Sequence, residues 1–390
     1  MVLSKRERVI QTLELEEPDM VPIHFMGFEK TGISYKYFTE SKEFNKYKTY
    51  IKNDFQKLKY KRTEDITELR FWNVDLYEMD PWMNQKIKIK TINAPPEYPD
   101  CIMFTYDGRV WKFKKQVETG LTYHWYEDGY FKTPDIVHEY WDKYGKPIDL
   151  INNRTNYSAQ IWERYVESLS DYLYPMAKLP ISLHESLFEG MTMARVAYYM
   201  RKNPQFIHEI LKEFSKVNLE IIKRLAEAGV DIVFYLDDLG AKGRSIFSLE
   251  QFKEFILPYY REIYQTCKKY GMFVIQHSCG YIDRLLPHMV DAGLDGIQAL
   301  EPAASVDLKK LKETLGDRLS FLGGIDASNI LNFGSPKDVS EEVKRCIKAT
   351  AQGGGYFAGP SHNILNAPWE NIIALRTAIE KYRKYPLTFQ

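Results

Sequence analysis

Three segments in the second half of the chain repeat one pattern of polar and apolar positions. In each, a stretch with helical spacing runs into glycine and then into a short apolar segment, at 226–233, 291–297 and 350–357. This pattern predicts a helix that ends at a glycine in the left-handed conformation and is followed by a buried strand. Two further apolar segments lie between them, at 272–276 and 319–322. Strands are therefore expected to begin near residues 232, 273, 297, 319 and 356.

The spacing of these strands indicates the fold class. Helical patterns such as Leu249–Tyr270 fill the intervals, and strands that alternate with helices form a parallel sheet. So many units over this length favour a (β/α)8 TIM barrel over an open sheet. The sequence thus predicts an α/β protein whose chemistry lies at the C-terminal ends of the barrel strands.

The first half of the chain has strand-like alternation and many aromatic residues. Cys101–Tyr106, the pair Asp107-Gly108 and Arg109–Lys114 predict a β-hairpin, and Lys86–Ile92 alternates like a neighbouring strand. We therefore expect an antiparallel, aromatic-rich cap, at about 27–175, inserted into a single barrel domain that spans 1–390. The aromatic side chains are expected to pack on one another, with the lining of a pocket for a flat substrate as the alternative. They are Trp72, Tyr77, Trp82, Trp111, Tyr123, Trp125 and Tyr126.

Composition and charge narrow the function classes. The chain has 390 residues, 44% of them hydrophobic, which is enough for a complete barrel core and an additional module. Its 53 basic and 53 acidic side chains give no net charge, so neither nucleic acid nor an anionic membrane is an expected partner. No apolar run has the length of a membrane span, and Ser4 with Glu7 predicts a helix capping box rather than a signal peptide. A cytoplasmic location is therefore expected.

The strand predicted at Phe273–Gln276 delivers His277 and Cys279 into a turn at Gly280. Residues two apart on a strand project from the same face, so imidazole and thiolate converge on one point. These groups are the usual ligands of zinc, and a catalytic zinc site typically takes three protein ligands and keeps one position open. The alternative is a buried thiol beside a hydrogen-bonded histidine.

Polar residues also follow the other predicted strands. An acidic residue at such a place is often a helix N-cap, which is the expected role of Asp326. Alternation along the strand at 232–236 would direct one residue of the pair Asp237-Asp238 into the mouth of the barrel and the other toward the helices. The remaining residues are Glu301, His362 and Asn363, and also His184 and Glu185 after a strand predicted at 180–183. Together these residues predict a polar crater that can bind a metal ion.

Four motifs occur together in the region 179–381. They are Asp237-Asp-Leu-Gly240, Ser248-Leu-Glu-Gln-Phe252, His277-Ser-Cys-Gly280 and Gly359-Pro-Ser-His-Asn-Ile364. As a set they resemble motifs of the uroporphyrinogen decarboxylase superfamily, in its corrinoid-dependent methyltransferase (O-demethylase-like) branch. The segment 4–22 resembles the N-terminal helix and first strand of that family.

The chain also departs from the family pattern. True uroporphyrinogen decarboxylases carry an arginine-rich segment after the first strand that binds substrate carboxylates, whereas Pro22–Ser34 contains no arginine. Porphyrinogen decarboxylation is therefore not expected. Coenzyme M methyltransferases of the branch have a second, distant cysteine as a zinc ligand, and His362 stands at that place in this chain. The resemblance leaves open whether His362 is a ligand or a proton carrier.

The resemblance implies a methyltransferase that moves a methyl group from a small methylated donor, such as a methoxylated aromatic, to the cobalt of a separate corrinoid protein. Zinc on the leaving oxygen would act as a Lewis acid. His277 and Cys279 are the expected zinc ligands, completed by Glu301 or His362. The expected catalytic groups are Asp237, Asp238 and His362, and the substrate would be held by His184, Glu185 and Asn363.

Two other functions stay open at this stage. One is a methylcobalamin:thiol methyltransferase of the coenzyme M type, in which the zinc activates a thiol. The other is a metal-free, decarboxylase-like lyase or a binding protein without activity. A homodimer is compatible with the sequence but not indicated by it.

Overall fold

The computed structural model describes residues 2–48, 63–79, 91–104, 106–115, 117, 120, 122–152, 162, 166–167, 169 and 172–389. Seven parallel strands form one sheet in the order β1-β6-β7-β10-β11-β12-β13. Their bounds are β1 Leu76–Met79, β6 Tyr174–Lys178, β7 Ile232–Leu236, β10 Phe273–Ser278, β11 Gly296–Ala299, β12 Ser320–Gly323 and β13 Tyr356–Phe357. All five strands predicted in the second half of the chain are confirmed, with starts within one residue of the expected positions.

The segment at residues 23 and 24 closes the sheet into a barrel. Ile23 forms a parallel bridge to Ala358 beside β13, and His24 forms a parallel bridge to Leu76 in β1. The N–H of His24 donates to the carbonyl oxygen of Ala358 at 3.0 Å, and the N–H of Leu76 donates to that of Ile23 at 3.2 Å. With this eighth segment between β13 and β1, the barrel predicted from the sequence is confirmed.

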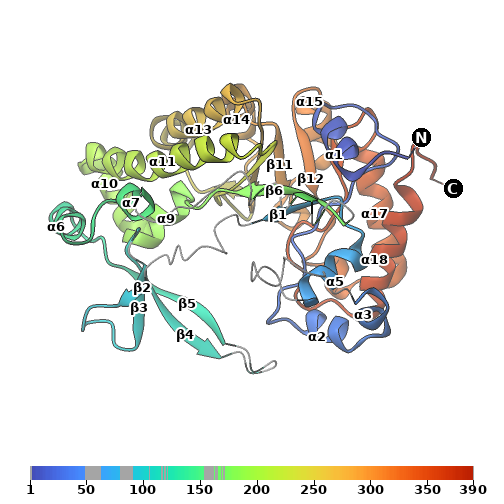
Figure 1. The fold of residues 1–390 in the computed structure, drawn as a ribbon, viewed down its shortest axis with the longest axis horizontal. Helices are drawn as coiled ribbons and strands as arrows, with labels where there is room; N and C mark the ends of the chain where they lie inside the picture. The colour runs from blue at the N-terminus through green and yellow to red at the C-terminus, as the bar shows by residue number, and fades with distance from the viewer. Residues whose placement is uncertain are drawn as a thin grey trace.

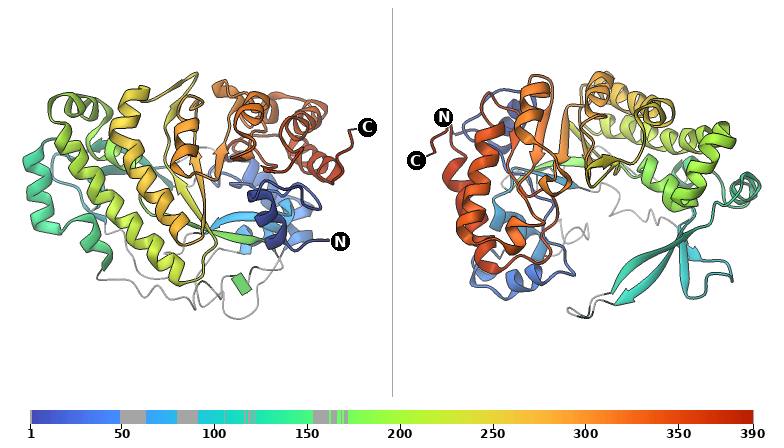
Figure 2. Two further views of the ribbon diagram at one scale, coloured as in Figure 1. Left: turned by 90° about the horizontal axis from the view of Figure 1, so that it is seen from above. Right: turned by 180° about the vertical axis from the view of Figure 1, so that it is seen from behind.

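Helices surround the barrel, as the helix–glycine–strand pattern predicts (Figures 1 and 2). The glycines that follow α11, α14 and α17 have left-handed φ angles, for example 75° at Gly229 and 114° at Gly293. The helices that precede β1 are α1 Lys5–Leu13, α2 Ile33–Glu40, α3 Lys42–Tyr47 and α5 Thr63–Trp72. The helices that follow β6 are α9 Leu183–Met191, α10 Met193–Lys202, α11 Pro204–Glu227, α12 Leu249–Gln251, the π-helical turn η1 Phe252–Ile256, α13 Leu257–Lys269, α14 Leu286–Ala292, the 3-10 turn η2 Pro302–Ala304, α15 Leu308–Leu315, α16 Ile330–Phe333, α17 Pro336–Thr350 and α18 Trp369–Tyr382.

Helix α1 covers the N-terminal end of the barrel. The capping box predicted from Ser4 and Glu7 is present at its start. Val9 and Leu13 of this helix join a buried cluster with interior side chains of the barrel, among them Phe234 and Ile275. This apolar plug leaves the C-terminal ends of the strands as the end of the barrel at which polar groups gather.

An antiparallel sheet is inserted between β1 and β6. It contains β2 Thr91–Asn93, β3 Cys101–Phe104, β4 Arg109–Lys115 and β5 Thr122–Gly129, and the helices α6 Pro134–Tyr144 and α7 Pro147–Asn152 follow it. The predicted hairpin is confirmed by the pairing of β3 with β4, whereas most of the strand predicted at 86–92 lies outside the described residues. The paired strands β4 and β5 extend away from the barrel (Figure 1 and the right view of Figure 2).

The range 27–175 that the sequence assigns to the cap includes the barrel strand β1. The described part of the insertion therefore begins after Met79, and the cap as a domain division stays a prediction. Two of its predicted aromatic residues differ in environment: Trp72 is buried and stacks on Phe25 at 4.4 Å between ring centroids, whereas Trp125 is 48% exposed. Trp82 lies outside the described residues.

The strand predicted at 180–183 is not present. The barrel strand ends at Lys178, and a short loop at 179–182 leads into α9, which begins at Leu183. Proline at position 180 has no N–H to donate to a sheet, and Ser182 followed by Glu185 has the spacing of a helix start. His184 and Glu185 thus lie in the first turn of a helix rather than at the end of a strand.

A search of the described residues finds no helix that combines the length and the apolar character needed to cross a membrane.

Candidate metal centre at the mouth of the barrel

Three side chains converge at the C-terminal ends of β7 and β10. His277 is the last but one residue of β10, and Cys279 follows the strand. The Nε2 atom of His277 lies 3.2 Å from Sγ of Cys279 and 3.3 Å from Oδ1 of Asp238, which follows β7. Among the described residues, these three offer ligand atoms that all lie within 4.8 Å of one another. The convergence of His277 and Cys279 agrees with the prediction from strand alternation.

The charges of this group are coupled. Burial alone would raise the pKa of Asp238, but its hydrogen bond and charge interaction with His277 lower that pKa to about 2. Burial would lower the pKa of His277, yet Asp238 and Cys279 raise it well above its usual value. Burial raises the pKa of the Cys279 thiol despite the nearby imidazole. Without a metal ion, the pair Asp238–His277 is therefore ionised and the thiol is protonated at neutral pH.

The turn after β10 is fixed by carboxylates from neighbouring strands. The backbone N–H of Cys279 donates to Oδ1 of Asp238 at 2.7 Å, and that of Gly280 donates to Oε2 of Glu301 at 2.8 Å. Gly280 has a φ of 79°, and a Cβ there would lie 2.3 Å from the backbone of Gly240. The turn thus requires glycine at position 280. Glu301 lies beside the three converging side chains but is not one of them.

His362 and Asn363 follow β13 on the same rim. The ring centroid of His362 lies 6.3 Å from that of His277. Partial burial and the charge of His277 lower the pKa of His362, so this imidazole is neutral at neutral pH. Oδ1 of Asn363 is buried and has no hydrogen-bond partner among the described residues. His362 is therefore near the group, and the distance between ring centroids is too long for a hydrogen bond to be inferred from it.

Asp237 turns away from the group and binds the start of α9. Its two carboxylate oxygens accept the N–H groups of His184 at 2.9 Å and of Glu185 at 3.0 Å. The hydroxyl of Tyr260 in α13 donates to it at 2.7 Å, and its side chain is fully buried. The two adjacent aspartates thus point in opposite directions, as alternation predicts, and Asp237 takes the place of an N-cap for α9.

The first turn of α9 brings two further predicted residues to the rim. Nδ1 of His184 contacts the carbonyl oxygen of Asp238 at 2.6 Å, so it carries the proton, while Nε2 is buried without a partner among the described residues. Burial lowers the pKa of His184 to about 4. Burial and the charges of Asp237 and Asp238 raise the pKa of Glu185 to about 7. Glu185 is thus a carboxyl group that exchanges its proton near neutral pH.

Sequence reasoning missed three polar residues that face the barrel interior. His24, in the closing segment, is buried, and its Nδ1 contacts the carbonyl oxygen of Leu76 at 3.0 Å. Lys178, the last residue of β6, pairs in register with the interior residue Phe234. Gln298 of β11 pairs in register with His277. Each of these residues lies at or near the end of an apolar strand, which the sequence could have indicated. Only the strand register, however, shows which face of the sheet each side chain occupies.

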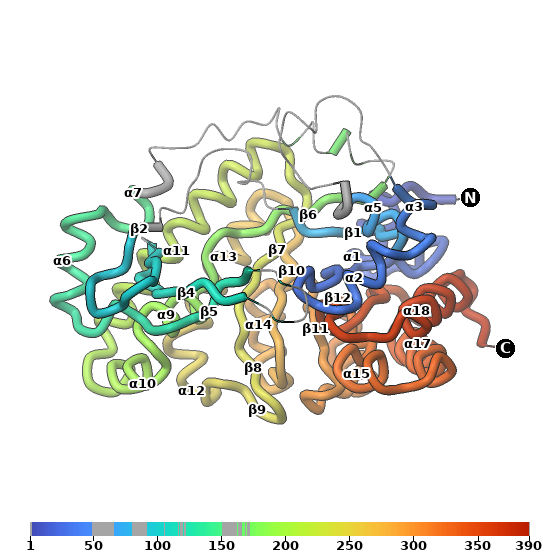
Figure 3. The backbone as a smooth tube through the Cα atoms, turned by 90° about the horizontal axis from the view of Figure 1, so that it is seen from below, coloured from blue at the N-terminus to red at the C-terminus, as the bar shows by residue number. Residues whose placement is uncertain are grey.

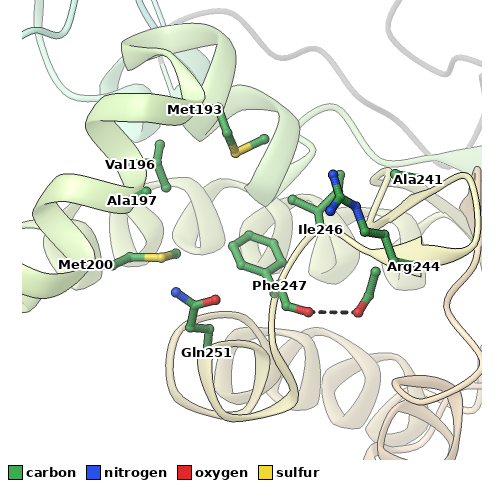
Figure 4. Close-up of a pocket in the computed structure, with 10 residues that line it drawn as sticks. Met193, Val196, Ala197, Met200, Ala241, Arg244, Ile246, Phe247 and Gln251 are labelled. Carbon is green, nitrogen blue, oxygen red and sulfur yellow. Dashed lines mark hydrogen bonds between the residues drawn. The ribbon is translucent and has the colours of Figure 1, made fainter.

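A cavity of about 440 Å³ lies next to this site, between α10 and the two-stranded ribbon β8 (Gly240–Ala241) and β9 (Arg244–Ser245) (Figure 4). Its lining is mainly apolar and includes Met193, Met200 and Phe247. The ring of Phe247 packs edge-on against His184, with 4.7 Å between centroids. None of the three converging side chains lines the cavity; His184, which contacts the carbonyl oxygen of Asp238, packs against its lining residue Phe247.

Comparison with known proteins identifies the family. Residues 119–382 match the family model described as Uroporphyrinogen decarboxylase (URO-D), which covers more than half of the chain. The chain therefore belongs to this family, and the resemblance seen in its motifs is confirmed.

Its relatives include both decarboxylases and methyltransferases. The uroporphyrinogen decarboxylase of Chlorobium luteolum is 29% identical over 174 residues, which are 43% of this chain and 46% of the relative. The methylated-thiol–coenzyme M methyltransferase of Methanosarcina mazei is 24% identical over 202 residues, 52% of this chain and 51% of the relative. The methylcobamide:CoM methyltransferase MtbA of Methanosarcina acetivorans is 24% identical over 143 residues, 37% of this chain and 40% of the relative. The matches span about half of these proteins or less.

A solved structure extends the likeness in fold to nearly the whole chain. The structure of a methyltransferase from Methanosarcina mazei has a TM-score of 0.65 with 14% identity, over 97% of this chain and 99% of that one. At this identity the likeness concerns the fold, which it confirms as the barrel of the family.

Proposed function

We propose that the protein transfers a methyl group from a small methylated donor to the cobalt of a separate corrinoid protein, with a zinc ion held at the barrel mouth. The observation that carries the proposal is the convergence of imidazole, thiolate and carboxylate groups at the ends of β7 and β10. The methyltransferases among the relatives support the class of reaction.

The donor set fits a zinc ion. His277, Cys279 and Asp238 supply nitrogen, sulfur and oxygen ligands, the three kinds that zinc accepts, and three protein ligands leave one position for a substrate. We assign Asp238 as the third ligand in place of Glu301 or His362, because its carboxylate is already within 3.3 Å of Nε2 of His277. A zinc ion held there would supply a Lewis acid that stabilises negative charge on the leaving oxygen.

The residues around the group have complementary roles in this proposal. Glu185, with its raised pKa, donates a proton to the leaving oxygen. His362 is neutral and can accept a hydrogen bond from the substrate, whereas Oδ1 of Asn363 is buried and is assigned no substrate contact. Asp237 holds the first turn of α9, which carries Glu185, but does not contact the substrate because it is fully buried.

The donor is proposed to be a methoxylated aromatic compound, and the corrinoid to arrive on its own protein. The absence of arginine in Pro22–Ser34 argues against a polycarboxylate substrate. The aromatic residues Trp125 and Phe113, about half exposed at 48% and 51%, lie on β5 and β4, which extend away from the barrel (Figure 1), so they do not bear on the choice of donor.

A second candidate is the methylation of a thiol from methyl-cobalt. The names of two relatives, a methylated-thiol–coenzyme M methyltransferase and a methylcobamide:CoM methyltransferase, favour it. The same three ligands would then hold the zinc that binds the thiol. A metal-free lyase reaction has weaker support, because it leaves the convergence of the three ligand groups without a role.

The test combines metal analysis with a spectroscopic assay. The purified protein is expected to hold about one zinc per chain, and Cys279→Ala to lose most of it while Cys267→Ala, a buried thiol in α13, keeps it. With a reduced corrinoid protein and a methoxylated aromatic, the cobalt(I) absorption should disappear as methyl-cobalt forms, with one demethylated product per cobalt. Full activity in a metal-free protein would contradict the zinc mechanism, and turnover of methylcobalamin with a thiol alone would select the second candidate.

A further inference from the structure

Gln298 is the neighbour of His277 on the strand β11. The two residues pair in register, and Gln298 is fully buried inside the barrel. Its Oε1 is in hydrogen-bond contact with Nδ1 of His277. A carbonyl oxygen can only accept, so Nδ1 carries the proton, and Nε2 is the ring atom that faces Cys279 and Asp238.

We propose that Gln298 is the positioning residue of this site: its amide fixes the ring and the tautomer of His277, and its lack of charge keeps the bound metal ion electrophilic. The proposal rests on the metal site of the proposed function. It concerns a residue that touches neither substrate nor metal and acts only through His277.

The choice of an amide has a chemical consequence. Metal-bound histidines commonly donate their second N–H to a carboxylate or a carbonyl oxygen, which orients the ring and raises its basicity. The ligands Cys279 and Asp238, when ionised, already balance the two charges of a zinc ion. A carboxylate in place of Gln298 would add a third negative charge and would weaken the Lewis acid that the reaction needs. A neutral amide orients the ring without that charge.

The burial of this amide agrees with such a role. Nε2 of Gln298 is buried and has no hydrogen-bond partner among the described residues. Leaving a buried donor unpaired destabilises a protein. An apolar residue would avoid this loss, so a function for the carbonyl oxygen accounts for the amide.

The chain offers a closely matched control in Gln276. It is equally buried, it lies on the neighbouring strand β10, and its Nε2 likewise has no partner among the described residues. Its Oε1, however, accepts the hydroxyl of Tyr264 in the helix layer and does not contact His277. Gln276→Met therefore removes a buried amide without removing the support of the imidazole.

The experiment compares Gln298→Met, Gln298→Glu and Gln276→Met in the full chain. Zinc affinity is measured by competition with a chromophoric chelator, and the ligand geometry by the absorption spectrum of the cobalt(II)-loaded protein. Gln298→Met is expected to bind zinc about 10–100-fold more weakly and to change the cobalt spectrum. Gln276→Met is expected to match the wild type in both. Gln298→Glu, which keeps an acceptor for Nδ1, is expected to bind zinc at least as tightly as the wild type but to transfer methyl groups more slowly.

Each outcome decides the inference. Wild-type zinc affinity in Gln298→Met, or an equal loss in Gln276→Met, would overturn it while the proposed function stands. If Gln298→Met does not fold, Gln298→Asn withdraws the oxygen by one methylene and is expected to show the same loss of affinity. A wild type without zinc would overturn the proposed function together with the inference. Zinc binding that depends on Gln298 in a protein without methyl transfer would overturn the proposed function alone.

Discussion

At the scale of single residues, two aspartates at the barrel mouth have pKa values that their surroundings shift in opposite directions. Asp237 and Asp238 are adjacent in the chain. Burial raises the pKa of Asp237 to about 6, although it accepts two backbone N–H groups. Contact with His277 lowers the pKa of Asp238 to about 2 despite its burial. Asp238 is therefore available as an anionic ligand at any physiological pH.

Glu185 gives a prediction at this scale. In the proposed reaction Glu185 is the proton donor and must be protonated; since its pKa is about 7, the rate of demethylation should fall as the pH rises through 7. Glu185→Gln should lower the rate by roughly 10²–10⁴-fold, the usual contribution of a general acid. The measurement is the rate of methyl-cobalt formation between pH 6 and 8.5, on the order of one pH unit on either side of that pKa. A variant that retains the wild-type pH profile would show that Glu185 is not the donor.

At the scale of elements, α9 links the candidate metal centre to the inserted antiparallel sheet. Its first turn is held by Asp237, and one turn further on Glu189 pairs with Arg109 of β4. Arg109 also pairs with the buried Asp107 and donates to Ser186 at 3.0 Å. The helix therefore connects the end of β7 to the base of the inserted sheet. A movement of that sheet would consequently displace Glu185.

The hold of Asp237 on this helix can be measured. Asp237→Asn leaves one acceptor oxygen for two backbone N–H groups and should lower the free energy of unfolding by about 1–3 kcal/mol. Tyr260→Phe removes one donor and should cost about 1 kcal/mol. Urea denaturation gives both values, and the rate of methyl transfer should fall in Asp237→Asn because Glu185 loses its position. Unchanged stability and rate would show that the contacts of Asp237 are dispensable.

At the scale of the whole molecule, one buried carboxylate joins the two ends of the chain to the barrel. Asp75, just before β1, accepts a hydrogen bond from Arg8 of α1 at 2.6 Å and another from Arg383, after α18, at 2.7 Å. It also accepts the N–H of Ile23 in the closing segment at 2.8 Å. Figures 1 and 3 show both termini at the same end of the molecule. The barrel closure and the terminal helices thus depend on the same ionic contact.

This network predicts a large effect on stability. Asp75→Asn leaves two buried arginines without full compensation and should destabilise the protein by about 3–5 kcal/mol. The control is Asp291→Asn, which breaks the exposed pair with Arg318 and should change stability by less than about 1 kcal/mol. Thermal and urea unfolding measure both. Equal effects of the two substitutions would show that the buried network does not hold the barrel closed.

The sequence by itself determined the barrel and the centre of its site. Apolar runs that end in glycine turns depend on local conformational preferences, so strands near 232, 273, 297, 319 and 356 could be predicted with their helices. The convergence of His277 and Cys279 follows from the two-residue period of a strand, which is also local. His184 and Glu185 were wrongly predicted to follow a strand and lie instead in the first turn of α9, because the apolar run at 179–183 is compatible with both a strand and a helix start.

Only the tertiary structure decided which residues complete the site. Asp238, Glu301 and His362 all follow strands, and their distances to His277 depend on barrel register and on the turn at Gly280, which involve residues far apart in the chain. The same holds for Gln298, whose contact with His277 exists because β10 and β11 pair in one register. Strand periodicity fixes the face on which a side chain lies, but its neighbours across the sheet are set by long-range pairing.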